Sequence, residues 1–201
     1  MKKLFVMAAV TMMAAVGVHA QNGYEDTKHE VAVSYGVHST SQWVDVFENA
    51  SVTLTTATLV KYTDGKFIGP ISAEYFYHLK PWFGLGGVFV YGKNKQDMLI
   101  GDKKDGTLMH SYFTLMPAVK FDWLRTKYFG MYSKLAAGLT LRTESLDTND
   151  PGVKSDKASL AHFNWQVSAL GIEAGSPTVR GFAELGFGEQ GVFLVGIRCK
   201  F

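Results

Sequence analysis

The sequence has little cysteine, little charge and, beyond its first residues, no long apolar run. One residue of the 201 is a cysteine, Cys199, so an intrachain disulfide is excluded. Only 19% of the residues are charged, with 20 basic against 18 acidic side chains, which excludes recruitment of nucleic acid by a basic surface. No stretch of 18 apolar residues follows residue 20, so no membrane-spanning helix is expected there.

The first twenty residues have the pattern of a secretory signal. Lys2 and Lys3 form a basic end, Leu4 to Val18 an apolar stretch, and Val18-His19-Ala20 a cleavage site of small residues. We expect residues 1–20 to be removed and residues 21–201 to form the mature protein. Because the two lysines leave with the signal, the mature chain carries no net formal charge. The position of Cys199 excludes a lipoprotein.

From residue 30 onward, apolar residues alternate with polar or small ones. This period of two is typical of strands whose two faces meet different media. It predicts eight strands, at 29–37, 67–79, 82–93, 108–123, 128–143, 160–173, 179–188 and 192–201. In the last of them, Phe193, Val195 and Ile197 alternate with Gly196, Arg198 and Lys200.

The charged residues of these strands lie on one face, opposite the aromatic and aliphatic side chains. They are Glu30, Glu74, Lys120, Asp122, Lys134, Arg142, Arg180, Glu184, Arg198 and Lys200. Lys93 and Glu173 fall on the other face, and we interpret them as strand ends where the chain leaves the sheet. A shift of one residue would reverse every side chain, so this agreement predicts a two-faced sheet.

Three features indicate that the apolar face is turned outward, as in a membrane barrel, and not inward, as in a soluble lipocalin-like barrel. The polar face is too poor in charge for bulk water, and its small residues suit a narrow filled lumen. Short connections at Lys80-Pro81, 124–127 and 174–178 alternate with long ones at 38–66, 94–107 and 144–159. Tyr and Trp gather near strand ends, as an interfacial girdle does. We therefore predict an all-β, eight-stranded antiparallel outer-membrane β-barrel.

Two local features are less regular. Trp43, Phe47 and later apolar residues have helical spacing after Ser41, a suitable N-cap, which favours a short helix within residues 38–66. The alternative is a strand over Val52–Tyr62, which would make an odd number of nine strands. Pro117 interrupts the strand at 108–123 and predicts a bulge.

The stretches Tyr112–Trp123 (YFTLMPAVKFDW) and Gly181–Gly188 (GFAELGFG), with a terminal Phe201, resemble the outer membrane protein β-barrel domain family. Its members are small barrels like OmpX and the membrane half of OmpA. The resemblance implies a monomeric integral protein of the bacterial outer membrane, often without a defined activity. It also implies that Phe201 serves as an insertion signal for the barrel-assembly machinery.

The sequence offers little for catalysis. Some eight-stranded barrels modify lipid A with a His and a Ser on a rim, but Asn164 replaces a Ser two residues after His162, and no acid lies near His38. The histidines are never paired at metal-ligand spacing, so we expect no metal, no cofactor and no enzyme.

The inward charges carry the remaining functional hypotheses. Buried charges must pair, because an unpaired buried ion is costly. We expect a lumen charge network that plugs the barrel, formed by Glu74, Lys120, Lys134, Arg180, Glu184 and Arg198. The predicted function is non-enzymatic, structural or surface-interacting through the long outer loops. The alternatives are a narrow porin-like channel and, third, a lipid A-modifying enzyme. Membrane lipid is the expected surrounding, and no residue identifies a loop partner.

Overall fold

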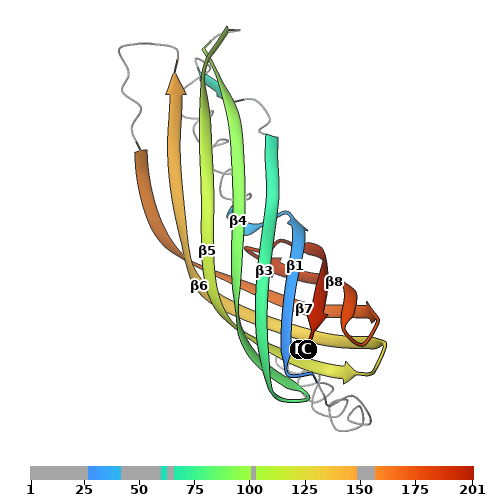
Figure 1. The fold of residues 1–201 in the computed structure, drawn as a ribbon. Helices are drawn as coiled ribbons and strands as arrows, with labels where there is room; N and C mark the ends of the chain where they lie inside the picture. The colour runs from blue at the N-terminus through green and yellow to red at the C-terminus, as the bar shows by residue number, and fades with distance from the viewer. Residues whose placement is uncertain (1–26, 42–59, 63–65, 101–102, 149–156) are drawn as a thin grey trace, which may run out of the picture.

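The computed structural model describes residues 27–41, 60–62, 66–100, 103–148 and 157–201 (Figure 1). The expected signal, residues 1–20, lies outside these ranges. Among the described residues, no helix is long and apolar enough to cross a bilayer. The strands are β1 (His29–Val37), β2 (Val60–Tyr62), β3 (Lys66–Lys80), β4 (Phe83–Ile100), β5 (Lys103–Arg125), β6 (Phe129–Thr148), β7 (Lys157–Gly175), β8 (Val179–Gly188) and β9 (Phe193–Lys200).

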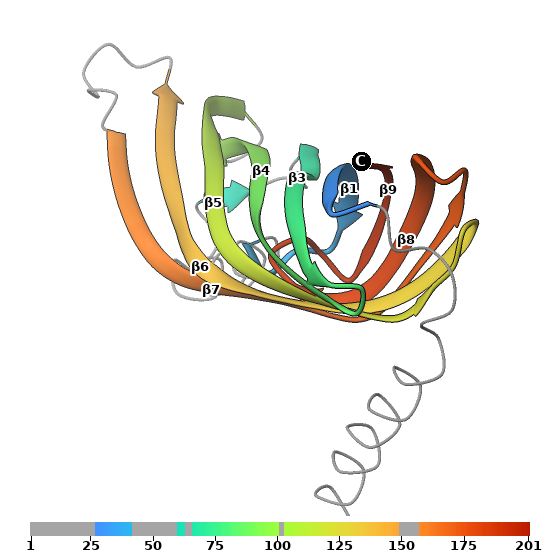
Figure 2. The same cartoon turned by 60° about the horizontal axis from the view of Figure 1, so that its bottom comes forward.

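Eight of these strands close into an antiparallel barrel. Each pairs with its neighbours in the order β4-β3-β1-β9-β8-β7-β6-β5, and β5 returns to β4. The two ends of the barrel sequence meet where β1 pairs with β9, for example at Val33↔Ile197, and Figure 2 shows the C-terminus beside β1. Around the closed ring every strand is paired on both sides. A β-sheet that spans a bilayer needs this closure, because unpaired backbone N–H and C=O groups are costly in hydrocarbon. The predicted eight-stranded antiparallel barrel is confirmed.

The short strand β2 lies outside the ring. Among the described strands it pairs with the last residues of β4 alone, through Val60↔Ile100 and Tyr62↔Met98. A ninth strand therefore exists without making the barrel odd-numbered. The helix expected after Ser41 falls on residues 42–59, outside the described ranges.

The connection at 94–107, expected to be a long loop, is instead a strand hairpin. The β4–β5 ladder continues from Asn94↔His110 to Ile100↔Lys103. Likewise β6 extends to Thr148 and β7 begins at Lys157, within the stretch 144–159 that was also expected to be a loop. The period of two is absent from the sequence there, although the backbone pairing goes on. In Figure 1, β4, β5 and β6 rise well beyond β1 and β8.

The bulge expected at Pro117 is not there. The β5–β6 register is the same on both sides of the proline, from Leu115↔Leu139 to Ala118↔Ala136, and the shift lies between Asp122 and Leu124. Proline lacks an N–H, so it interrupts the ladder without adding a residue to it.

Burial alternates along the strands as the sequence predicts. On β1, Val33 is 56% exposed and its neighbour Ser34 only 4%. The inner face holds the charges and one apolar patch on the β3–β6 wall. That patch consists of Phe76, Val88, Val90, Met116, Ala118 and Ala136. The barrel is thus apolar outside and largely polar inside, the reverse of a soluble protein.

Gly138 permits β6 to approach β5 closely beside Pro117. A Cβ on Gly138 would lie 2.1 Å from the carbonyl oxygen of Leu115 and 2.7 Å from Cα of Met116. We expect Gly138→Ala to lower the free energy of unfolding by about 1–3 kcal/mol through this overpacking. The measurement is urea unfolding in detergent, followed by the heat-dependent gel shift of the folded barrel. Gly87→Ala is the matched control, because its Cβ would meet only the Met116 carbonyl oxygen at 3.8 Å. Equal losses in the two variants would contradict the steric explanation.

Candidate functional site

The centre of the lumen network is Glu173 on β7. Its carboxylate accepts from Arg180 Nη1 at 2.8 Å, from Arg198 Nη1 at 2.7 Å and from the Lys200 ammonium. Arg180 and Arg198 are fully buried, and Glu173 is 1% exposed. Strands β7, β8 and β9 thereby meet in one cluster of ions.

A second carboxylate cluster is centred on Glu30 and shares Lys200 with the first. Glu30 on β1 accepts from Lys120 Nζ at 2.6 Å and from Lys200 Nζ at 3.0 Å. His78 lies between two carboxylates, with Nε2 3.0 Å from Glu30 and Nδ1 3.4 Å from Asp122. The cluster ties β1 to β3, β5 and β9 across the lumen.

A third cluster lies halfway along the barrel. Lys134 on β6 donates to Glu74 and, at 2.9 Å, to Glu184. Glu184 also accepts from the Tyr132 hydroxyl at 2.7 Å and from Ser168 Oγ at 2.6 Å. These additional donors matter because a buried ion pair stabilises only when its remaining lone pairs are satisfied.

Arg198 joins the three clusters. Its guanidinium lies 3.6 Å from Glu30, 3.4 Å from Glu74 and 3.8 Å from Glu184, in addition to Glu173. Its planar group lies between two aromatic rings, 4.6 Å from the centroid of Tyr132 and 4.4 Å from that of Phe182. Arginine suits this place because it stacks on rings while donating in its own plane.

The charges of these clusters balance. The ion pairs join the carboxylates of Glu30, Glu74, Asp122, Glu173 and Glu184 to the cations of Lys120, Lys134, Arg180, Arg198 and Lys200, with His78 as an additional base. Every one of these side chains is at most 5% exposed. The lumen at this level is therefore filled with paired ions, as expected for an eight-stranded barrel.

The six network residues named from the sequence all lie on the inner face of the barrel. Glu74, Glu184 and Lys134 meet in one cluster. Arg180 pairs with Glu173 and Lys120 with Glu30.

The placement of Glu173 on the outer face was wrong. A register shift between Ser168 and Leu170 moves the later residues of β7 by one position, which turns Gly171 and Glu173 inward. A bulge reverses the faces beyond it, and no residue type in this stretch signals it. Tyr132 and His78 also belong to the network and were missed, because an inward Tyr or His does not stand out in an alternating pattern.

A separate polar cluster closes the lumen above the ions. Glu189, in the β8–β9 turn, is 2% exposed. It accepts from Ser41 Oγ at 2.8 Å, from the Ser41 backbone N–H at 3.2 Å and from Asn164 Nδ2 at 2.7 Å. Burial raises the pKa of the Glu189 carboxyl, and these hydrogen bonds oppose that shift. The cluster fastens the chain after β1 to the turn between β8 and β9.

The other histidines have partners of their own. His29 Nδ1 lies 2.9 Å from the Tyr75 hydroxyl, and its ring stacks on Phe201. His110 contacts Arg142 and Tyr112. Among the described residues, no three His, Cys, Asp or Glu side chains are arranged to hold a metal ion.

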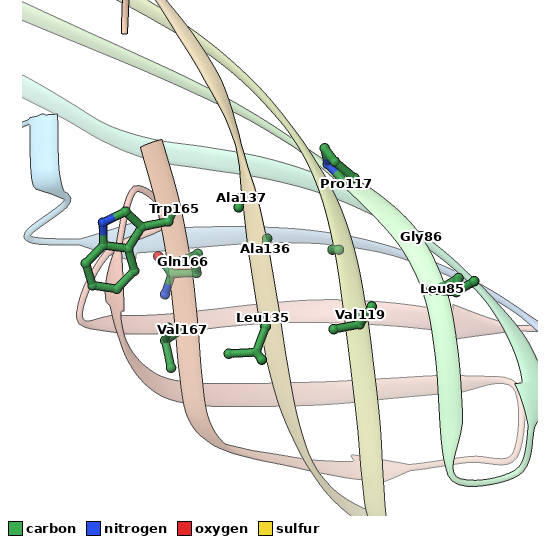
Figure 3. Close-up of a pocket in the computed structure, with 11 residues that line it drawn as sticks. Leu85, Gly86, Pro117, Val119, Leu135, Ala136, Ala137, Trp165, Gln166 and Val167 are labelled. Carbon is green, nitrogen blue, oxygen red and sulfur yellow. The ribbon is translucent and has the colours of Figure 1, made fainter. Parts of the chain in front are cut away.

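The outer wall is apolar and slightly hollowed. Figure 3 shows side chains of this wall from four adjacent strands, among them Leu85, Val119, Leu135, Trp165 and Val167, together with Pro117 and Ala137. Exposed aromatic residues mark both ends of this wall. Tyr77, Trp82, Tyr128 and Phe201 lie at the short-turn end, with the pairs Tyr91–Phe113 and Trp165–Phe187 at the other.

An apolar wall between aromatic girdles, around a lumen of paired ions, defines an eight-stranded β-barrel of the outer-membrane type. No protein-family model matches the chain, and no curated protein matches its sequence.

Solved structures of Ail, the attachment invasion locus protein of Yersinia pestis, are similar in fold. Ail in complex with the heparin analogue sucrose octasulfate is 12% identical over 87% of this chain and 99% of its own, with a TM-score of 0.47. The backbone structure of Ail in a phospholipid bilayer nanodisc is 13% identical over 88% and 100%, with a TM-score of 0.37. At this identity the likeness concerns the fold alone.

Removing the central carboxylate should destabilise the barrel strongly. We expect Glu173→Gln to lower the free energy of unfolding by about 3–5 kcal/mol, because three buried cations lose their shared partner. The double variant Glu173→Gln/Lys200→Met restores the charge balance and should be less destabilised than the single variant. Urea unfolding in detergent measures both. A single variant as stable as the wild type would contradict the network's structural role.

Glu189 should make stability depend on pH. Because its pKa is higher in the folded than in the unfolded protein, the folded state binds its proton more readily. Its contribution to stability is therefore largest at acidic pH and falls as the pH rises through the folded pKa. We expect the difference in unfolding free energy between wild type and Glu189→Gln to change in that direction between pH 5 and pH 8. A difference that does not vary with pH would contradict the assignment.

Proposed function

We propose that this protein is a non-enzymatic barrel of the bacterial outer membrane that binds a macromolecular partner at the cell surface. Residues 1–20 act as the cleaved export signal, and both ends of the mature chain face the periplasm. The short turns then lie in the periplasm, and the protruding parts of β4–β7 stand outside the cell. The packed lumen argues against a steady channel, since paired side chains fill its cross-section.

The observation that carries this proposal is a strand edge on β7 that no other described strand covers. Strand β8 reaches only as far as Gln166↔Gly188, and the last contact on that side is the N–H of Glu189 donating to the Trp165 carbonyl at 3.0 Å. Beyond Trp165, β7 pairs with β6 alone among the described strands. Leu160 and Phe163 are 65% and 67% exposed there.

The direction of the backbone identifies which residues offer this edge. The Trp165 carbonyl points toward β8, and alternate residues of an antiparallel strand share that direction. Ser159, Ala161 and Phe163 therefore present their N–H and C=O groups away from β6. Such an edge accepts an added strand from a partner, with main-chain hydrogen bonds for affinity and side chains such as Phe163 for specificity.

If a partner adds a strand to this edge, its binding depends on hydrogen bonds from main-chain N–H groups of β7, such as that of Ala161. Cells that produce the protein are tested against a panel of purified secreted and matrix proteins. We expect Ala161→Pro to weaken an interaction at least about fivefold, through the lost hydrogen bond and the added ring. Ala161→Val, which keeps the N–H, should bind like the wild type. A proline variant that binds equally well, or a wild type that binds nothing in the panel, would refute the role of this edge.

We also propose that Phe201 is the signal read during insertion. Its backbone exchanges hydrogen bonds with His29, at 2.8 and 2.9 Å, and its ring stacks on the imidazole. Phe201 is still 62% exposed, so folding alone gives it limited burial. Deleting it should therefore reduce assembly in cells more than refolding in detergent, both scored by the heat-dependent gel shift. Equal reductions would show that Phe201 acts only by packing.

A further inference from the structure

Three exposed lysines lie at the short-turn end of the barrel. Lys28 precedes β1, Lys80 ends β3, and Lys127 lies in the β5–β6 turn. Two of them lie over aromatic rings of the girdle. Lys80 Nζ is 5.7 Å from the ring centroid of Trp82, and Lys127 Nζ is 5.6 Å from that of Tyr128. Lysine and aromatic side chains thus alternate along this rim.

The acidic side chains of the same end are all inside. Among the described residues here, Glu30, Asp122 and Glu173 carry the carboxylates, and each is at most 5% exposed. These carboxylates form ion pairs with the buried cations of the lumen. Among the described residues, the exposed charged side chains of this rim are therefore all lysines.

Two buried arginines fix the backbone that carries these lysines. Arg125 donates to the Pro81 carbonyl at 3.2 Å and to the Thr27 carbonyl, which joins the β3–β4 turn to the segment before β1. Arg180 donates to the carbonyls of Thr126 and Lys127 at 2.7 and 2.9 Å. The three lysines therefore extend from segments that are held together, and not from independent loops.

We propose that Lys28, Lys80 and Lys127, with Trp82 and Tyr128, form a headgroup site for anionic phospholipid in the leaflet that faces the short turns. Aromatic rings place this rim at the interface, where lipid phosphates lie. Lysines near an anionic surface attract it, and a zwitterionic headgroup lacks the net charge that they would neutralise. The site rests on the proposed membrane placement but is independent of the β7 edge.

The test measures lipid selectivity of the full mature chain in phosphatidylcholine bilayers. Spin-labelled phosphatidylglycerol or phosphatidylcholine is added in trace amount, and the motionally restricted fraction gives the relative association with the barrel. We expect wild type to prefer phosphatidylglycerol about threefold, since a single lysine contributes a factor of about five at most. The preference should shrink in 0.5 M salt.

Matched variants identify the lysines responsible. K28Q/K80Q/K127Q should abolish the preference, and K28R/K80R/K127R should keep it. K95Q/K103Q/K104Q makes the same charge change in the protruding β4–β5 hairpin and should leave the preference intact. Equal association of both lipids with wild type, or equal loss in the two glutamine triples, would overturn the proposal. Barrels are first checked for the gel shift and for resistance to urea extraction. Failure to insert would overturn the membrane placement itself, which separates the two failures.

Discussion

The fold depends on the pairing of buried ions in the lumen. Five carboxylates and five cations lie in a space too narrow for bulk water, and each lacks any alternative to a protein partner. An unpaired member costs several kcal/mol, so strands that are distant in the sequence must meet in one register. Glu173 and Arg198 show this most clearly, because between them they contact β1, β3, β5, β8 and β9.

The same constraint separates the two surfaces of the barrel. Because the ions occupy the inner face of the sheet, the alternating apolar side chains lie on its outer face. An apolar outer face is stable in the hydrocarbon of a membrane. The described acidic side chains at the short-turn end are buried in the same way, so the described charges on its surface are Lys28, Lys80 and Lys127.

Unequal strand lengths leave one edge of β7 without a partner among the described strands beyond Trp165. Strands β8, β9 and β1 have 10, 8 and 9 residues, whereas β4, β5, β6 and β7 have 18 to 23. A ring closed at one level therefore opens above it into a curved sheet, and there the edge of β7 pairs with no other described strand. Within the bilayer a free edge would be costly, but outside it the unpaired groups remain available to water or to a partner.

The sequence by itself predicted the eight barrel strands, their antiparallel closure and the face on which ten charges lie, because a period of two shows which side of the sheet each residue takes. It did not determine the partners of those charges. A bulge after Ser168 turned Glu173 inward, and Pro117, the residue that most suggested a bulge, left the register unchanged. The protruding hairpin escaped detection as well, since its residues do not alternate although its backbone pairs. Only the tertiary structure decided which carboxylate meets which cation. Residues on opposite walls meet at a level set by the registers of all the strand pairs between them, and the sequence pattern does not give these registers.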